Sequence, residues 1–310
     1  MVSIPDITRT ATSKKKIFSD KALARVAMLA AVAIWGSAFV AIKIALTDTG
    51  PIMLAVLRFA IAAALFLPFL AKYMKTSSLP VLPLAAAGFF GVTLFFSLQN
   101  IGLYYTSAAS TGLIQGSIPV FTLLFSVLLL GEKITFARGT GVICSVTGVS
   151  LVVVAGATPQ AGSLLGNLLV LGSAVAWALY TIKGRALVGK VPQHIAAAGS
   201  VIFGLLFLLP FLLLEVRFVS YQPISPAAWI AVIYLGLFAS GAAFFLWNYG
   251  LRSMSAAEAG TYTNLAPVVS LVTAAALLGE TIGLSHLLGG SMVIAGVYLS
   301  GLSAASSKET

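Results

Sequence analysis

Long apolar runs follow one another along nearly the whole of this 310-residue chain. A helix that crosses about 30 Å of hydrocarbon needs roughly 20 apolar residues, and ten runs of about that length are present. Their polarity does not alternate as it would in the strands of a membrane barrel. We therefore predict an all-α membrane protein with ten transmembrane helices, at residues 23–45, 51–71, 82–104, 108–130, 134–154, 164–186, 194–214, 227–250, 256–278 and 282–303.

The composition agrees with a chain that faces lipid. Hydrophobic residues make up 59% of it and charged residues only 8%, whereas a water-soluble domain carries about 25% charged residues. The net charge of +10 would suit a nucleic-acid partner, but the charges lie in short gaps between the apolar runs and not along one face. We therefore expect the lipid bilayer as a partner and no nucleic acid.

The distribution of Lys and Arg predicts the orientation, because these residues mark the cytoplasmic side of short loops. With the N-terminus inside, fifteen of the eighteen fall in cytoplasmic segments, Arg217 falls outside, and Lys43 and Arg58 lie within spans. The first run is too long for a signal peptide and nine more follow it, so we interpret it as an uncleaved span. We predict that both termini are cytoplasmic, in the inner membrane of a bacterial cell.

The sequence also repeats itself without a gap at an offset of 148 residues. The segment FSLQNIGL at 96–103 lies over FFLWNYGL at 244–251, and Pro119 lies over Pro267. A looser match pairs Trp35 with Trp177. A repeat of five spans must enter the membrane in the opposite orientation the second time, and such inverted repeats are typical of alternating-access transporters. The predicted units are a basic cytoplasmic segment at 1–22, one repeat at 23–157, an inverted repeat at 158–303 and a cytoplasmic tail at 304–310.

Three motifs resemble a known family. They are AIWGSAF at 33–39 followed by Lys43, LRF at 57–59, and LLGE at both 129–132 and 277–280. In this combination the chain resembles the drug/metabolite transporter superfamily, in its ten-helix EamA-like branch, and is similar there to bacterial amino-acid exporters of the YddG type. The resemblance implies a carrier for a small-molecule substrate such as an amino acid or related metabolite. The family also includes importers and sugar-nucleotide carriers.

Pro119 and Pro267 occupy matching places near the middle of the fourth and ninth spans. A proline removes one backbone hydrogen bond and disturbs the carbonyl four residues earlier, here that of Gln115 or Thr263. Broken helices in a bilayer usually line a cavity, although both prolines could instead kink helices only for packing. We predict that the two spans face each other across the substrate path. The expected substrate contacts are Gln115, Thr263 and Asn264, and the expected hinge residues are Pro119, Pro267 and Gly116.

Aromatic residues recur at helical spacing in the first and sixth spans. Trp177 and Tyr180 are three residues apart and Trp35 and Phe39 are four apart, so each pair shares one helix face. Such a face can hold the apolar part of an amphipathic solute, or it can pack against lipid or other helices. Both readings stay open, with Trp35, Phe39, Trp177 and Tyr180 as candidate substrate contacts.

Two cations fall inside predicted spans, where a charge is a functional hypothesis by default. Lys43 is close enough to a helix end to reach water. Arg58 lies deeper, and it could meet a substrate carboxylate, or else bridge helix-end carbonyls or Asp48. We include Arg58 among the candidate substrate contacts.

Helix caps are predicted where the fourth and ninth spans begin. Ser255 and Glu258 have the spacing of a capping box. Ser107, the match of Ser255 in the first repeat, is expected to cap the fourth span.

No Asp or Glu lies in the middle of a predicted span, and proton coupling generally needs such a group. The chain has no phosphate-binding Gly-rich loop and no catalytic or metal-binding constellation, so we predict neither an enzyme nor a cofactor. The expected function is facilitated export of small amphipathic metabolites, with neutral or aromatic amino acids foremost. A proton-coupled multidrug or metabolite exporter is the alternative, and a channel is less favoured. Ten spans suffice for a complete pathway, so we expect a functional monomer.

Overall fold

The computed structural model describes residues 7–131, 136–155, 164–184, 187, 190–219, 221, 223–251, 262 and 265–306. Every regular element in these residues is a helix. This confirms the all-helical fold. In the first predicted repeat the elements are α1 (Ile7–Ala45), α2 (Pro51–Met74), α3 (Val81–Gly88), η1 (Phe89–Leu94), α4 (Phe95–Tyr105), α5 (Ala108–Gln115), α6 (Ile118–Leu130) and α7 (Phe136–Ala155).

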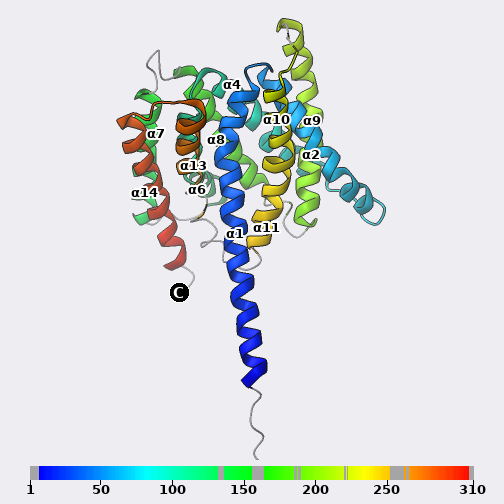
Figure 1. The fold of residues 1–310 in the computed structure, drawn as a ribbon, viewed down its shortest axis with the longest axis vertical. Helices are drawn as coiled ribbons and strands as arrows, with labels where there is room; N and C mark the ends of the chain where they lie inside the picture. The colour runs from blue at the N-terminus through cyan, green and yellow to red at the C-terminus, as the bar shows by residue number, and fades with distance from the viewer. Residues whose placement is uncertain are drawn as a thin grey trace, which may run out of the picture.

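The second predicted repeat has the same succession of long and divided helices. Its described elements are α8 (Leu164–Gly184), α9 (Gln193–Phe218), α10 (Pro226–Tyr234), η3 (Leu235–Ala242), α11 (Ala243–Leu251), α13 (Ala266–Leu278) and α14 (Leu284–Ser306). Figure 1 shows that α1 begins, and α14 ends, at the same end of the bundle.

Seven helical spans in the described residues are long and apolar enough to cross a membrane. Three shorter apolar helices, at 139–154, 266–278 and 284–299, lie where the fifth, ninth and tenth spans are expected. The seven long spans confirm a multi-pass membrane protein. They run over 22–45, 51–74, 81–105, 108–130, 164–184, 193–218 and 226–247.

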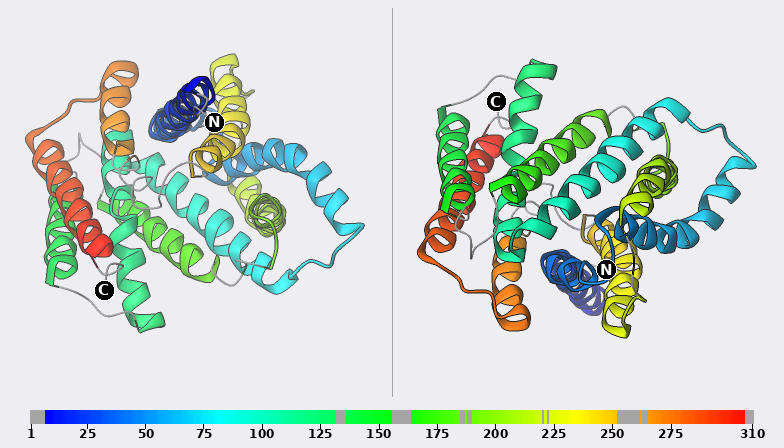
Figure 2. Two further views of the ribbon diagram at one scale, coloured as in Figure 1. Left: turned by 90° about the horizontal axis from the view of Figure 1, so that it is seen from below. Right: turned by 90° about the horizontal axis from the view of Figure 1, so that it is seen from above.

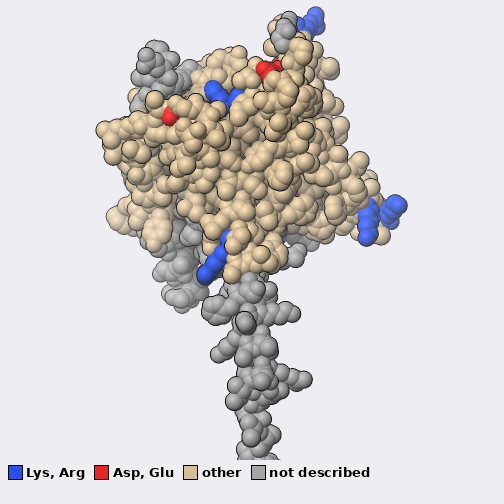
Figure 3. Space-filling model, in the orientation of Figure 1, with Lys and Arg blue, Asp and Glu red and all other residues tan. Residues whose placement is uncertain are grey.

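The surface is suited to lipid. Leu82 and Phe218 are 81% and 82% exposed, and many other large apolar side chains are also exposed. Figure 3 shows a face whose broad middle carries no charged side chain among the described residues. An apolar surface this extensive is not compatible with water. The helices therefore present lipid-facing sides all around a buried interior.

The helices pack closely where glycines let backbones approach, as is common in membrane bundles. α7 packs against α14, while α2 and α3 pack against α9, and Figure 2 shows these two groups at opposite sides of the molecule. A Cβ atom on Gly148 would lie 2.5 Å from the Gly289 carbonyl oxygen, and one on Gly296 would lie 2.5 Å from the Gly141 carbonyl oxygen. A shift of 148 residues turns Gly148 into Gly296 and Gly141 into Gly289, so each contact maps onto the other.

Two spans contain a π-helical segment, η1 within 81–105 and η3 within 226–247. The two segments overlap at the 148-residue offset. A π-helical turn adds a residue to the helix and is frequent at functional sites. Thr93 in η1 donates a hydrogen bond from its hydroxyl to the Gly204 carbonyl at 3.0 Å, which ties this segment to α9.

The fourth span is divided into two helical segments. The sequence analysis expected Pro119 to disturb the helix at the Gln115 carbonyl, and α5 ends at Gln115 while α6 begins at Ile118. Pro119 therefore lies in the first turn of a new helix, where its missing N–H costs nothing. Pro267 has the same place at the start of α13. Gly116 and Ser117 keep right-handed helical angles, and Ser117 N donates to the Ile114 carbonyl at 3.0 Å, so the division is one tighter turn between two helical segments.

Candidate functional site

A central cavity of about 380 Å³ lies within the bundle. This volume is within the range of small-molecule sites, about 300–1,000 Å³. Residues from both predicted repeats line it. They include nine that the sequence singled out: Trp35, Phe39, Arg58, Gln115, Gly116, Pro119, Trp177, Tyr180 and Pro267. The structure therefore brings together residues that lie up to 232 positions apart in the chain.

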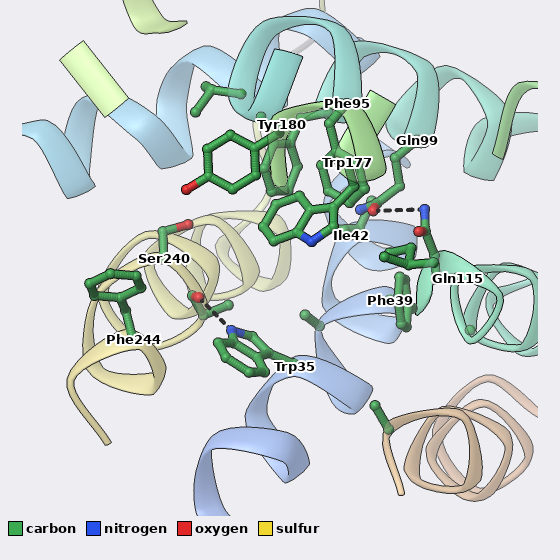
Figure 4. A pocket seen from close by; sticks show the side chains of 18 of the residues that line it. Trp35, Phe39, Ile42, Phe95, Gln99, Gln115, Trp177, Tyr180, Ser240 and Phe244 are labelled. Atoms are coloured by element: carbon green, nitrogen blue, oxygen red, sulfur yellow. Dashed lines mark hydrogen bonds between the residues drawn. The ribbon is translucent and has the colours of Figure 1, made fainter. Parts of the chain in front are cut away.

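Aromatic rings form one wall of the cavity. The ring centroid of Trp177 is 4.7 Å from that of Phe95 and 5.0 Å from that of Tyr180. Trp35 packs against Trp247 at 5.3 Å, and its indole N–H donates to the Ala239 carbonyl at 3.1 Å. Because that bond satisfies the indole nitrogen of Trp35, its ring is held in one orientation. Figure 4 shows Trp35, Trp177 and Tyr180 around the same space.

One end of the cavity, which we call the glutamine end, is formed by Gln99 and Gln115, and the buried Ser173 binds Gln115. Gln115 Nε2 donates to Ser173 Oγ at 2.6 Å and to Gln99 Oε1 at 3.3 Å. Ser173 Oγ donates its own proton to the Val170 carbonyl at 2.6 Å, so it must accept the hydrogen bond from Gln115. This fixes the orientation of the Gln115 amide. Its Oε1 atom is buried without a hydrogen-bond partner among the described residues.

The other end, which we call the arginine end, is formed by Arg58 and Ser240. Arg58 Nε and Nη2 donate to Ser240 Oγ at 3.1 and 2.9 Å. The guanidinium carbon lies 4.5 Å from the ring centroid of Phe96 and 5.2 Å from that of Phe59. Arg58 is only 3% exposed, and its Nη1 has no hydrogen-bond partner in the described structure. Figure 4 places Ser240 and Tyr180 on the side of the cavity opposite Gln99 and Gln115.

The division of the fourth span borders the cavity. A Cβ atom on Gly116 would lie 3.0 Å from Pro267 Cγ, so the divided helix touches the start of α13. Further along the same interface, Ser270 Oγ donates to the Ala108 carbonyl at 3.0 Å. α5 and α13 are thus in direct contact at these points, whereas the sequence analysis expected the fourth and ninth spans to face each other across the substrate path. Pro119 and Pro267 both line the cavity at this contact.

The start of α5 is held by a local serine cap and by a carboxylate from a distant part of the chain. Ser107 Oγ accepts a hydrogen bond from Ser110 N at 2.9 Å. The Glu280 carboxylate accepts from Ala108 N and Ala109 N at 2.8 and 2.9 Å. A carboxylate is well placed here because a helix N-terminus carries a partial positive charge. Sequence reasoning proposed the serine cap but not the distant carboxylate.

Lys43 binds the end of α4, which directly precedes the start of α5 in the chain. Its ammonium group donates to the Leu103 and Thr106 carbonyls at 2.9 and 2.6 Å. These are carbonyls at the end of α4, which have no partner within the helix. Lys43 therefore binds helix-end carbonyls and does not extend freely into water.

The same end of the bundle carries two further carboxylates, and neither of them reaches Arg58. Glu215 accepts from Ile52 N and Met53 N at 2.8 Å each, at the start of α2. Tyr221 donates to Glu215 Oε1 at 2.7 Å, and the pKa of Tyr221 is raised by burial and then by this bond and the charge of Glu215.

Asp48 accepts from Ser225 N at 3.0 Å. Hydrogen bonds from Ser225, chiefly from its side chain, hold the pKa of the Asp48 carboxyl below its usual value. Asp48 is thus engaged at the start of α10, so the sequence-based alternative of a bond from Arg58 to Asp48 is not found.

Four of the predicted residues, Thr263, Asn264, Ser255 and Glu258, lie outside the described residues. Other residues of the site were missed. Gln99 and Phe96 lie in the repeated segment 96–103, which was a usable signal. Ser173 and Ser240 are single hydroxyls in apolar helices, and nothing in their surroundings in the sequence distinguishes them from packing residues.

Comparisons with known proteins agree with a transport role. The model of the EamA-like transporter family matches residues 23–154 and again 164–302. An uncharacterized transporter of Archaeoglobus fulgidus is 32% identical over 270 residues, covering 86% of this chain and 95% of that protein. A probable terminal-alkyne amino-acid exporter of Streptantibioticus cattleyicolor is 30% identical, covering 88% of this chain and 91% of that protein.

A relative and a solved structure at lower sequence identity also match. A probable amino-acid metabolite efflux pump of Salmonella typhimurium is 26% identical, covering 87% of this chain and 92% of that protein. A protein of known crystal structure shares the fold with a TM-score of 0.62 at 22% identity, covering 91% of this chain and 98% of that one. Because the family model covers most of the sequence in two matches, the resemblance seen in the motifs is confirmed. The chain belongs to the EamA-like transporter family.

Proposed function

We propose that the protein is an alternating-access carrier that exports small amphipathic metabolites, with neutral and aromatic amino acids as the leading class. The observation that carries the proposal is the central cavity, which has aromatic walls between two polar ends and is lined from both repeats. Such a cavity suits a solute with an apolar body and polar groups. Two relatives named as a probable amino-acid exporter and a probable amino-acid metabolite efflux pump support this class of substrate.

The proposed topology is ten spans in two inverted repeats of five, with both termini in the cytoplasm of a bacterial cell and the chain in its inner membrane. Three observations support it. α1 begins and α14 ends at the same end of the bundle (Figure 1), as an even number of crossings requires. The contacts Gly148–Gly289 and Gly141–Gly296 exchange at the repeat offset. The family model matches twice in succession. The proposed functional unit is one chain.

Facilitated transport is proposed in preference to proton coupling. The described residues that line the cavity include no Asp or Glu. A proton-coupled carrier generally needs an ionisable group that exchanges a proton for substrate. Movement of the substrate down its own concentration gradient therefore agrees best with this lining.

Reconstitution of the purified protein in liposomes tests these proposals. Uptake of radiolabelled amino acids should saturate, and unlabelled substrate inside the liposomes should accelerate it by counterflow. Protein-free liposomes are the control. Linear flux without counterflow would point to a channel, and no uptake across the whole panel would contradict the proposed class of substrate. Accumulation only under an imposed pH gradient would overturn facilitated transport in favour of proton coupling.

A further inference from the structure

Arg58 is a buried cation without a counter-ion in the described structure. It is 3% exposed and lines the central cavity, where it is the one positive side chain among the described lining residues. A charge removed from water is costly unless it is paired. Its recorded contacts are one hydroxyl and two ring faces. The two rings stabilise the guanidinium by cation–π contact, but none of these contacts supplies a negative charge.

The donors of Arg58 are only partly used. Nε and Nη2 both donate to Ser240 Oγ, whereas Nη1 has no partner in the described residues. Because Ser240 accepts from Arg58, the hydroxyl proton of Ser240 is directed elsewhere. The arginine end thus offers N–H and O–H donors and a full positive charge. This set matches a carboxylate, which is an acceptor at both oxygens.

A purely structural role does not account for the charge. The backbone around Arg58 packs closely against η3, since a Cβ atom on Gly236 would lie 3.1 Å from the Arg58 carbonyl oxygen. In the other half, a Cβ atom on Gly88 would lie 2.7 Å from the Ser200 carbonyl oxygen. Gly88 and Gly236 are equivalent at the 148-residue offset. Arg58 and Ser200 are 142 positions apart, which is also the separation of the matched pair Trp35 and Trp177 in the two halves. The same helix contact is therefore made with a serine in place of the arginine.

Among the described residues, the arginine end has a donor without an acceptor, and the glutamine end has an acceptor without a donor. Gln115 Oε1 is a buried acceptor without a described donor. Between the two ends lie the rings of Trp177, Phe95 and Tyr180 (Figure 4). A ligand that satisfies both ends carries a carboxylate at one end, an apolar body between the rings, and a hydrogen-bond donor that reaches Gln115 Oε1.

We propose that Arg58 and Ser240 form a carboxylate subsite, and that the carrier selects amphipathic carboxylates over the corresponding amides and amines. This deepens the proposed function, on which it rests, because it concerns the same cavity. Arg58 is then a specificity-determining residue. A guanidinium in an apolar site also repels organic cations, so cationic drugs are excluded for the same reason.

Binding of two matched probes to the purified full-length protein tests the proposal. 3-Phenylpropionate and 3-phenylpropionamide differ only in the group that Arg58 would meet, which is an anionic carboxylate in the first and a neutral carboxamide in the second. Calorimetry should show the acid binding about tenfold or more tighter than the amide, as expected for the loss of a charged hydrogen bond. Equal affinities for the two probes, or binding of neither, would overturn the subsite.

Variants test whether the preference for the acid probe over the amide depends on Arg58. R58Q should bring the two affinities together, and R58K should retain part of the difference because it keeps the charge but loses the planar fork. The matched control is R217Q, since Arg217 is exposed near the end of α9 and should leave the preference unchanged. A preference that persists in folded R58Q would contradict the proposal. The comparison of probes in the unaltered protein holds even if R58Q does not fold.

Uptake experiments separate this inference from the proposed function. Saturable amino-acid uptake without a preference for the acid probe would overturn the carboxylate subsite and leave the carrier intact. Absence of uptake for every amino acid would count against the carrier itself.

Discussion

Trp177 lies on the aromatic wall, where its ring contacts the rings of Phe95 and Tyr180. At the residue scale, its replacement tests whether this wall binds substrate. Loss of a stacking ring is worth about 0.5–1.5 kcal/mol beyond the lost apolar area, and 1.4 kcal/mol is a factor of ten in affinity. Trp177→Ala should therefore raise the KM for the best amino-acid substrate about tenfold.

The control for this change is Trp229→Ala. Trp229 lies on α10, is 41% exposed and does not line the cavity. The same atoms are removed there, so a general loss of stability would appear in both variants. Equal effects on KM in the two variants would contradict a role of the wall in substrate binding.

At the scale of elements, the contact between α7 and α14 depends on glycines, which have no side chain to hold the two backbones apart. A Cβ atom on Gly148 would lie 2.5 Å from the Gly289 carbonyl oxygen, which is backbone and cannot move aside alone. Gly148→Ala must push the two helices apart and should lower the free energy of unfolding by about 1–3 kcal/mol. Thermal unfolding in detergent measures this effect.

Gly139→Ala in the same helix is the matched control. A Cβ atom there would meet no atom within 4 Å. Alanine also has the higher helix propensity, so the control should be unchanged or slightly more stable. A similar loss in both variants would show that the close approach of α7 and α14 is not the cause.

The start of α5 gives a second test at this scale. Glu280 holds the Ala108 and Ala109 amides from 172 and 171 positions away in the chain. Glu280→Gln removes the charge and should weaken this hold by about 1–2 kcal/mol. Hydrogen exchange of these two amides should then accelerate by about 5- to 30-fold.

The amides of Ile52 and Met53 provide an internal control, because Glu215 holds them in the same manner at the start of α2. They should exchange at the original rate in Glu280→Gln and faster in Glu215→Gln. Acceleration of all four amides in either variant would indicate general unfolding instead of the loss of one cap.

At the scale of the whole molecule, the proposed topology predicts which loops face the cytoplasm. Thr76 follows α2 on the expected cytoplasmic side, and Val219 follows α9 on the expected outer side; both are exposed. Single cysteines at these positions, in a Cys144→Ser background, report the orientation. A membrane-impermeant maleimide added to intact cells should label V219C, and T76C only after the cells are opened. The reverse pattern would show that the orientation inferred from Lys and Arg is wrong.

The sequence by itself determined the helical fold and much of the cavity lining. The length of an apolar helix follows from local hydrogen bonds and from the thickness of the bilayer, so the runs predict the elements directly. Trp177 and Tyr180 share a face because three residues make nearly one turn. Pro119 and Pro267 could be picked out from the sequence because they occupy equivalent positions in the two repeats, 148 residues apart.

Only the tertiary structure decided how the polar groups pair. Ser240 and Arg58 are 182 positions apart, and many hydroxyls in apolar helices could have been the partner of Arg58. The two π-helical segments were likewise not predicted, and Thr93 ties one of them, η1, to α9. A local pattern specifies an element because the bonds within it are local. The arginine end combines α2 with η3, so it exists only once the two halves have packed together.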